Sequence, residues 1–285
     1  MPGTLVLVPT PIGNLDDITL RALRVLREAN VIAAEDTRRT SKLLTHFGIT
    51  TSTVSLHDHN ERYRIPGLVK RILAGETVAV VTDAGTPTVS DPGYALVRAT
   101  LDAGLRVEAL PGASALTVAL AGAGLPTDVV TFAGFPPSRA GARERWLQEF
   151  RSLPGTLVLF EAPQRLRASL QAIHDTLGNR QAVVAHELTK VHESWHRGPV
   201  AALATDPMLP EKGEFTVVVG PATEDSQTAT DTKPATPEEI GAQFGRMTNS
   251  GRFTRREVIA ELARTHRLSK KQIYALVEAG KSSGE

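Results

Sequence analysis

The sequence VAVVTDAGTPTVSDPG, residues 78–93, places a short apolar run directly before a loop rich in glycine, proline and aspartate. Val78 to Val81 has the length and composition of a strand buried on both faces, as parallel strands are. The loop would then lie at the carboxyl end of the strand, where open α/β sheets place their ligands. Gly85 lets a ligand approach the backbone, and Asp83 can accept hydrogen bonds from it. The same residues also suit an ordinary connection between a strand and a helix, so the rest of the chain has to decide.

The first 110 residues repeat this pattern of an apolar run, a polar turn and a helical stretch. The other apolar runs are residues 5–8, 31–34, 53–56 and 107–110. Asp17 is the predicted N-cap of the first helix. Strands that alternate with helices predict an α/β fold with a parallel sheet. The polar strand ends EDTR (35–38), HDHNE (57–61) and TDAGTP (82–87) should therefore gather at one edge of that sheet.

The second half predicts a further α/β domain with strands of its own. Its apolar runs are residues 129–133, 156–160, 182–185 and 215–219. The expected divisions are an N-terminal α/β domain (1–111), a second α/β domain (112–220), a flexible linker (221–235) and a basic helical segment (236–285). Thr236 and Thr254 each begin a capping-box pattern, which predicts helix starts in the last segment.

Composition limits the class of protein. Of the 285 residues, 41% are hydrophobic and 22% charged, which is typical of a soluble globular protein. No apolar run reaches the about 20 residues that a membrane helix needs. The chain has no cysteine, which excludes disulfides and fits a cytoplasmic location. Residues 246–285 hold nine Lys or Arg against four Asp or Glu. Such clustering suits a phosphate backbone, although solvated helix faces also carry it.

Two groups of polar residues leave alternatives open. His57 and His59 could reach one metal ion, because alternate residues of an extended segment point to the same side. No third ligand stands at a fixed spacing, so hydrogen bonding at a strand end is favoured and no metal is expected. Glu187 and Lys190 either form an exposed ion pair of little energetic weight or line a cleft, where burial can lower the pKa of a lysine.

Taken together, the motifs resemble a known family. VPTPIGNLDDIT, AAEDTR, LHDHNE, VTDAGTPTVSDPGY, LPGASA, GFPPSR, LFEAPQR and HELTKVHE occur in the order found in the ribosomal RNA small subunit methyltransferase I family, a branch of the tetrapyrrole methylase superfamily. The resemblance covers roughly residues 4 to 220, and its specificity comes from the ordered set rather than from any one motif. Porphyrin-modifying relatives have a glycine-rich turn with an aspartate where this chain has PTPIGN, which is similar to the RNA enzymes.

The resemblance implies two α/β domains with S-adenosylmethionine in the cleft between them, and a homodimer. It implies methylation of the ribose 2′-hydroxyl of a cytidine in 16S rRNA, presented as free RNA or as the assembled small subunit. The cofactor contacts carried over to this chain are Pro11, Asp83, Ala84, Gly85, Thr88, Ser114, Ala115, Phe160, Leu188 and Thr216.

The expected chemistry is in-line transfer with removal of one proton and no metal. Lys190 or His57 is the expected proton acceptor, with Asp36 and Glu187 orienting groups around it. No residue within 78–93 is expected to accept that proton. Phosphate contacts are expected from arginines of two segments, namely Arg38, Arg139 and Arg143.

Two other functions remain open on the sequence. One is a tetrapyrrole or diphthine-type methyltransferase on the same fold, against which the basic tail and the PTPIGN loop argue. The other is a non-catalytic, cofactor-sensing RNA-binding protein, because a fold alone does not imply a function.

Overall fold

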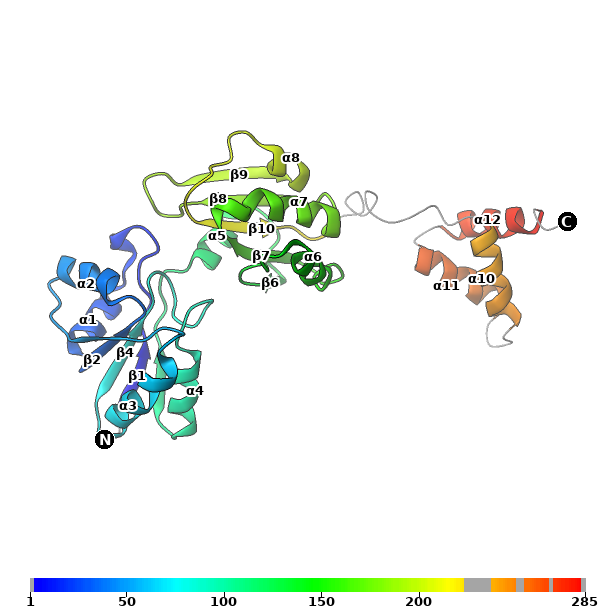
Figure 1. The fold of residues 1–285 in the computed structure, drawn as a ribbon. Helices are drawn as coiled ribbons and strands as arrows, with labels where there is room; N and C mark the ends of the chain where they lie inside the picture. The colour runs from blue at the N-terminus through cyan, green and yellow to red at the C-terminus, as the bar shows by residue number, and fades with distance from the viewer. Residues whose placement is uncertain (1–2, 223–236, 250–253, 267–268, 283–285) are drawn as a thin grey trace. The chain divides into compact units, whose positions relative to one another are not determined.

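The computed structural model describes residues 3–222, 237–249, 254–266 and 269–282. The chain divides into two compact units, Met1–Ser226 and Gln227–Glu285, which are considered separately (Figure 1). Residues 223–235, most of the expected linker, lie outside the described residues.

The first sheet of the larger unit has five strands, all parallel to their neighbours. They are β1 (Thr4–Leu7), β2 (Val31–Ala34), β3 (Thr53–Ser55), β4 (Thr77–Val81) and β5 (Arg106–Ala109). Their order is β3-β2-β4-β1-β5, so β4 lies in the middle (Figure 1). The expected parallel sheet is confirmed, and the strand that opens the VAVVTDAGTP stretch is its centre.

The sheet is buried on both faces, which explains the unbroken apolar runs. Val78 and Val80 pack on one face, under α3 (Glu61–Leu73) and α4 (Tyr94–Asp102). Ala79 and Val81 pack on the other face with residues from the other two helices of this sheet, α1 (Leu20–Glu28) and α2 (Thr37–His46). Each fully buried valine stabilises the fold by about 1.5–3 kcal/mol.

The start of α1 differs from the expectation. Asp17 lies in a short 3₁₀ turn, η1 (Leu15–Asp17), and the Thr19 hydroxyl is the N-cap, accepting the Ala22 N–H at 3.0 Å. The prediction of Asp17 was therefore wrong. The cause is local, because Asn14 Oδ1 accepts the Asp16 N–H at 3.1 Å and caps the preceding turn first.

The second sheet also has five strands. They are β6 (Val130–Phe132), β7 (Thr156–Glu161), β8 (Gln181–His186), β9 (Ser194–Pro199) and β10 (Phe215–Val219). The order is β6-β7-β10-β8-β9, with β6 and β7 parallel and every other pair antiparallel. The sequence did not indicate β9. Its residues, SWHRGP, form an edge strand that is half-exposed throughout, so no apolar period marks it.

Helices cover both faces of this sheet (Figure 1). They are α5 (Ala115–Ala123), α6 (Ala140–Gln148), α7 (Leu166–Leu177) and α8 (Val200–Thr205), with a short 3₁₀ turn, η2 (Pro163–Arg165), before α7. The cluster on the α5 face also contains Ile12 from the loop after β1 and Leu188 from the loop after β8. The two halves are thus packed through the same loops that carry motifs. The boundary expected between residues 111 and 112 falls between β5 and α5.

The smaller unit contains three described helices, α10 (Pro237–Asn249), α11 (Arg255–His266) and α12 (Lys270–Ser282). Apolar residues from all three, Ile240, Phe244, Val258, Leu262, Ile273 and Val277, form its core. The capping box at Thr254 is confirmed, since the Thr254 N–H donates to Glu257 Oε2 at 2.7 Å and the Glu257 N–H donates to Thr254 Oγ1 at 3.4 Å. The one predicted at Thr236 lies outside the described residues. Among the described helices, none combines the length and apolar character that a membrane crossing requires.

Candidate functional site

The loop after β4 is tied to the loop after β1 by a pair of backbone hydrogen bonds. The Thr10 N–H donates to the Gly85 carbonyl and the Gly85 N–H donates to the Thr10 carbonyl, both at 2.9 Å. Gly85 has a φ of 84°, which disfavours any side chain at this position. The glycine is therefore required by the backbone conformation of the loop that the sequence singled out.

Asp83 joins this loop to the end of β2. Its Oδ1 accepts the Asp36 N–H at 3.2 Å, and its own N–H donates to Glu35 Oε2 at 3.1 Å. Its Oδ2 pairs with Arg39 Nη1 at 3.2 Å. The strand ends EDTR and TDAGTP are thus brought together at one edge of the sheet.

Two loops at this edge contain backbone strain. Thr88 and Ser90 have φ of 73° and 64°, and Glu187 and Thr189 have φ of 50° and 65°. The left-handed region is costly for residues with a side chain and is concentrated at functional sites, where packing holds it. All four non-glycine residues with this conformation in the described chain belong to the TVSDPG and HELTK loops.

The PTPIGN loop packs directly against the HELTK loop. The Asn14 N–H donates to Thr189 Oγ1 at 3.0 Å. A Cβ on Gly13 would lie 2.4 Å from Lys190 Cγ and 2.9 Å from the Leu188 carbonyl oxygen. Only glycine fits this contact between segments about 175 residues apart.

We expect Gly13→Ala to lower the free energy of unfolding by about 1–3 kcal/mol, because a forced methyl group overpacks the contact. Gly67→Ala is the matched control. Gly67 lies inside α3 and a Cβ there meets no atom within 4 Å, so that change should raise stability by about 0.5–1 kcal/mol. Urea unfolding of both variants measures the difference, and equal stabilities would contradict the packing described.

These loops enclose a cavity of about 400 Å³. Its walls come from the ends of β2 and β4, the start of α5, the loop before α6, the end of β7, and the loops around β8 and β10. The lining residues include Ile12, Glu35, Arg39, Asp83, Ala84, Gly85, Thr86, Ser90, Asp91, Ser114, Ala115, Phe135, Phe160, Glu161, Leu188, Glu214 and Thr216.

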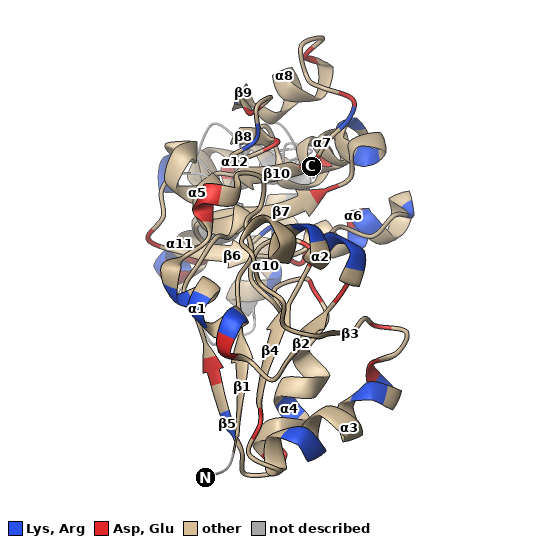
Figure 2. Ribbon diagram, turned by 90° about the vertical axis from the view of Figure 1, so that its left-hand side faces the viewer, with Lys and Arg blue, Asp and Glu red and all other residues tan. Residues whose placement is uncertain are grey.

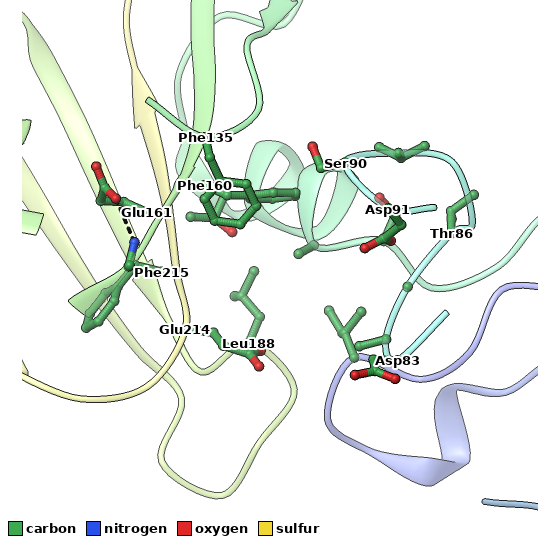
Figure 3. A pocket seen from close by; sticks show the side chains of 18 of the residues that line it. Asp83, Thr86, Ser90, Asp91, Phe135, Phe160, Glu161, Leu188, Glu214 and Phe215 are labelled. Atoms are coloured by element: carbon green, nitrogen blue, oxygen red, sulfur yellow. Dashed lines mark hydrogen bonds between the residues drawn. The ribbon is translucent and has the colours of Figure 1, made fainter. Parts of the chain in front are cut away.

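Two walls of the cavity face each other, one with aromatic and aliphatic side chains beside Glu161 and Glu214, the other with Asp83 and Asp91 (Figure 3). Phe135 and Phe160 lie with ring centroids 5.6 Å apart and face the interior together with Leu188. Asp83 and Asp91 lie opposite them on the β4 loop (Figure 3). An apolar pocket with a few converging polar groups is the usual form of a small-molecule site.

Glu161 is a buried carboxylate in the cavity wall. Its Oε1 pairs with Arg165 Nη2 at 2.7 Å and accepts the Ala162 N–H at 2.7 Å. Its Oε2 accepts a hydrogen bond from the Ser169 hydroxyl. A charge removed from water in this way is stable only because each oxygen has a partner.

Lys190 stands beside the cavity, and two carboxylates bind it. Its Nζ pairs with Glu187 at 2.9 Å and with Glu214 at 3.0 Å. Burial lowers the pKa of Lys190, but the hydrogen bonds to Glu187 and Glu214 outweigh burial and raise the pKa above its ordinary value. Burial likewise raises the pKa of Glu187, and the Lys190 ammonium outweighs it and lowers the pKa. Both groups are charged at neutral pH, so Lys190 has no free pair to accept a proton.

The other expected catalytic residues, His57 and Asp36, are not among the residues that line the cavity. His57 Nε2 lies 3.1 Å from Asn60 Nδ2, and its backbone N–H donates to Asn60 Oδ1 at 2.9 Å. Asp36 is the N-cap of α2, and the hydrogen bonds from Arg38 lower the pKa of its carboxyl to about 2. Asp36 therefore caps a helix, and the His57 ring contacts Asn60 in the loop after β3.

The expected cofactor contacts mostly converge on the cavity. Eight of them line it: Asp83, Ala84, Gly85, Ser114, Ala115, Phe160, Leu188 and Thr216. Pro11 instead lines a neighbouring depression, of about 280 Å³, which shares Arg39 and Asp83 with the cavity. Thr88 is not in the lining, and its Cγ2 lies near Gly93 within the loop.

The three arginines expected to contact phosphate differ in their exposure to solvent. Arg38 is exposed on α2 and pairs with Asp36 at 3.1 Å. Arg139 is the exposed N-cap residue of α6. Arg143 is 6% exposed, and its Nη1 donates to the Ser138 carbonyl at 3.4 Å, so its guanidinium lies inside the fold. This placement does not suit a contact with an RNA backbone, because Arg143 lies on the buried side of α6 together with Leu147.

Sequence reasoning assigned no role to several lining residues, notably Glu35, Arg39, Asp91 and Phe135. Glu35, Asp91 and Phe135 lie within the motifs AAEDTR, VTDAGTPTVSDPGY and GFPPSR, and Arg39 directly follows the first of them. The available signal was their position close after an apolar run, or in an Asp-Pro-Gly turn. Which of them faces the cavity depended on tertiary contacts.

Comparisons with known proteins agree with this arrangement. The family model of Tetrapyrrole (Corrin/Porphyrin) Methylases matches residues 4–204. A protein of Synechocystis sp. named ribosomal RNA small subunit methyltransferase I is 42% identical over 276 residues, 96% of this chain and 97% of its own. A protein of the same name from Pseudomonas aeruginosa is 48% identical over 222 residues, 76% of this chain and 78% of its own.

Solved structures share the fold. Uroporphyrin-III C-methyl transferase from Thermus thermophilus, complexed with S-adenyl homocysteine, superposes with a TM-score of 0.51 at 19% identity, over 76% of this chain and 96% of that one. The family model covers the first sheet and the second sheet as far as α8, and the relative from Synechocystis sp. matches 96% of the chain. The chain therefore belongs to the tetrapyrrole (corrin/porphyrin) methylase family.

Proposed function

We propose that this protein transfers a methyl group from S-adenosylmethionine to the ribose 2′-hydroxyl of a cytidine in small-subunit (16S) ribosomal RNA. The observation that carries the proposal is the cavity of about 400 Å³ built by the motif loops of both sheets. The names of the relatives that match most of the chain indicate the substrate class.

The lining suits this cofactor chemically. S-adenosylmethionine carries a sulfonium and an ammonium cation, an adenine ring and a ribose diol. The carboxylates of Asp83 and Glu35 favour cations on one side, and the rings of Phe135 and Phe160 offer apolar surface on the other. When bound, the cofactor supplies an electrophilic methyl group. The residues of the chain then have to exclude water, align the hydroxyl and take its proton.

α2 carries several basic residues (Figure 2), and some of them line the cavity or the depression beside it. Arg38 is exposed, Arg39 lines both the cavity and the neighbouring depression, and Lys42 lines the depression. Such residues suit phosphate oxygens of an RNA strand whose ribose enters the site. The proposal therefore places RNA contacts on α2 and on Arg139 rather than on the buried Arg143.

The test is methyl transfer from labelled S-adenosylmethionine to purified 16S rRNA, small subunits, porphyrin precursors and protein acceptors in parallel. We expect label in rRNA or small subunits, recovered as 2′-O-methylcytidine after nuclease digestion and mass spectrometry. If label appears only in a porphyrin or a protein, that molecule is the substrate and the proposed rRNA substrate is wrong. Cofactor binding without S-adenosylhomocysteine formation would indicate a sensing protein.

The smaller, helical unit is proposed to bind RNA electrostatically. Its exposed cations include Arg255, Arg256, Lys270 and Lys271. Deleting residues 237–285 should weaken binding to rRNA and reduce the slope of log K against log salt by about one for each phosphate that these helices neutralise. Cofactor affinity should not change, because the cavity residues all lie in Met1–Ser226. An unchanged salt slope would reject this role.

The proposal also includes a homodimer and a cytoplasmic location, both expected from the family resemblance. Sedimentation equilibrium of the full chain measures the first, and fractionation of cells expressing it measures the second.

A further inference from the structure

The proton released by the ribose hydroxyl needs an acceptor that faces the cavity. Most carboxylates of the lining already have a cation. Asp83 pairs with Arg39, Glu161 with Arg165 and Glu214 with Lys190. Among the described residues, Glu35 and Asp91 are the lining carboxylates without an ion pair.

Asp91 is directed at the cavity by the strained turn that precedes it. Ser90 holds a φ of 64°, and Pro92 fixes the backbone on the other side before Gly93, the N-cap residue of α4. Figure 3 shows the Asp91 carboxyl on the wall formed by the β4 loop, on the side of the cavity opposite Phe160 and Leu188. Strain of this kind is retained where packing needs a particular side-chain direction.

The surroundings of Asp91 favour the neutral carboxyl. Burial raises its pKa to about 7, with further contributions from the negative charges of Glu35, Asp83 and Asp58, and a hydrogen bond with the Thr82 side chain opposes the shift. Burial is also the largest cause of the raised pKa of Glu35.

The cations near the cavity do not cancel this effect. Arg39 on α2 is bound to Asp83, Arg165 before α7 to Glu161, and Lys190 after β8 to Glu187 and Glu214. A carboxyl with a pKa near the working pH is half ionised, which is the most effective state for a general base.

We propose that Asp91 is the general base of the reaction, an assignment that rests on the proposed function. The ribose 2′-oxygen forms a bond to the methyl carbon, the carbon–sulfur bond breaks, and its electron pair stays on sulfur. The hydroxyl proton passes to an oxygen of the Asp91 carboxylate, from which water removes it after product release. Asp91 thereby takes the part expected of Lys190 or His57.

Asp91→Asn should reduce the methylation rate on the order of 10²–10⁴-fold, the usual contribution of a general base. The wild-type rate should rise with pH and level off above about 7, because only the ionised carboxylate accepts the proton. The remaining activity of Asp91→Asn should lack this rise with pH, the acid limb of the profile. Asp102→Asn, an exposed aspartate paired with Arg98 on α4, is the matched control and should keep both the rate and the profile.

Glu35→Gln provides a readout that a purely structural Asp91 would not produce. Removing the charge of Glu35 takes away one cause of the raised pKa of Asp91. The acid limb should therefore move to lower pH in this variant. A limb that stays in place, or that also persists in Asp91→Asn, belongs to another group.

Thermal unfolding of the unliganded protein tests the same residue without any turnover. The folded chain holds the Asp91 proton more tightly than the unfolded chain, so wild-type stability falls as pH rises from about 4 to about 7. Asp91→Asn lacks this loss. Its Tm should exceed the wild-type Tm at pH 8, and the difference should disappear below pH 4.

The outcomes separate the two proposals. If the wild type methylates no RNA, the proposed function fails first. If the wild type methylates rRNA and Asp91→Asn keeps more than a tenth of the rate with an unchanged pH profile, Asp91 is not the base. Calorimetric affinity for S-adenosylhomocysteine, retained within a few-fold in Asp91→Asn, confirms that the variant still forms the site. A loss of that affinity together with the rate assigns Asp91 to cofactor binding and overturns the inference.

Discussion

Arg165→Met should lower the free energy of unfolding by about 3–5 kcal/mol, because it leaves a buried charge without its counterion. The Glu161 side chain is fully buried, and Arg165 pairs with it at 2.7 Å. Arg165 also donates from Nη1 to the Pro136 carbonyl at 3.2 Å, so the change releases the loop before α6. Urea unfolding at neutral pH, monitored by circular dichroism, measures the loss.

Two further variants decide whether the buried charge is the cause. Glu161→Gln combined with Arg165→Met removes both charges and should recover a large part of the stability, since replacing a whole buried pair is often nearly neutral. Arg98→Met removes an exposed partner of Asp102 and should cost under about 1 kcal/mol. A double variant as unstable as Arg165→Met would show that the arginine acts by packing alone.

Ala115→Trp should reduce affinity for S-adenosylmethionine by at least about 100-fold, or about 2.7 kcal/mol. Ala115 is the first residue of α5 and lines the cavity, so an indole there occupies space that the ligand needs. The variant should fold, because the new side chain enters an existing cavity instead of a filled core. Isothermal titration of cofactor into both proteins measures the effect.

Thr117→Trp is the control for this substitution. Thr117 lies on the same helix two residues later and is exposed, outside the cavity lining. An equal loss of affinity in Thr117→Trp would mean that the helix is disturbed as a whole. Unchanged affinity in Ala115→Trp would place the cofactor elsewhere.

Much of the first sheet could be predicted because its signals are local. The strand at Val78 to Val81 is apolar on both faces, and a run of that length between turn residues has few other solutions. β9 could not be predicted in the same way. Its half-exposed residues form a strand because they pair with β8, and this pairing exists only in the folded chain.

Part of the candidate site could likewise be predicted from the sequence, and part of it could not. The motif order and the glycine turn at Gly85 identified the loops, and eight expected cofactor contacts converge on one cavity. Proton chemistry could not be predicted, because it depends on partners distant in sequence. Lys190 meets Glu214, 24 residues away, and this contact keeps it charged.

Short-range patterns, residue composition and the ordered motifs were enough to establish the family, the alternation of strands and helices, and the loop that forms one wall of the site. The state of each ionisable group was set by the folded chain. Asp91 lies in the same stretch as Asp83, yet Asp83 forms an ion pair with Arg39, while burial and neighbouring carboxylates raise the pKa of Asp91 to about 7. Ionisation depends on distances and burial that no linear pattern contains, and for this reason the proton acceptor emerges only when the cavity is formed.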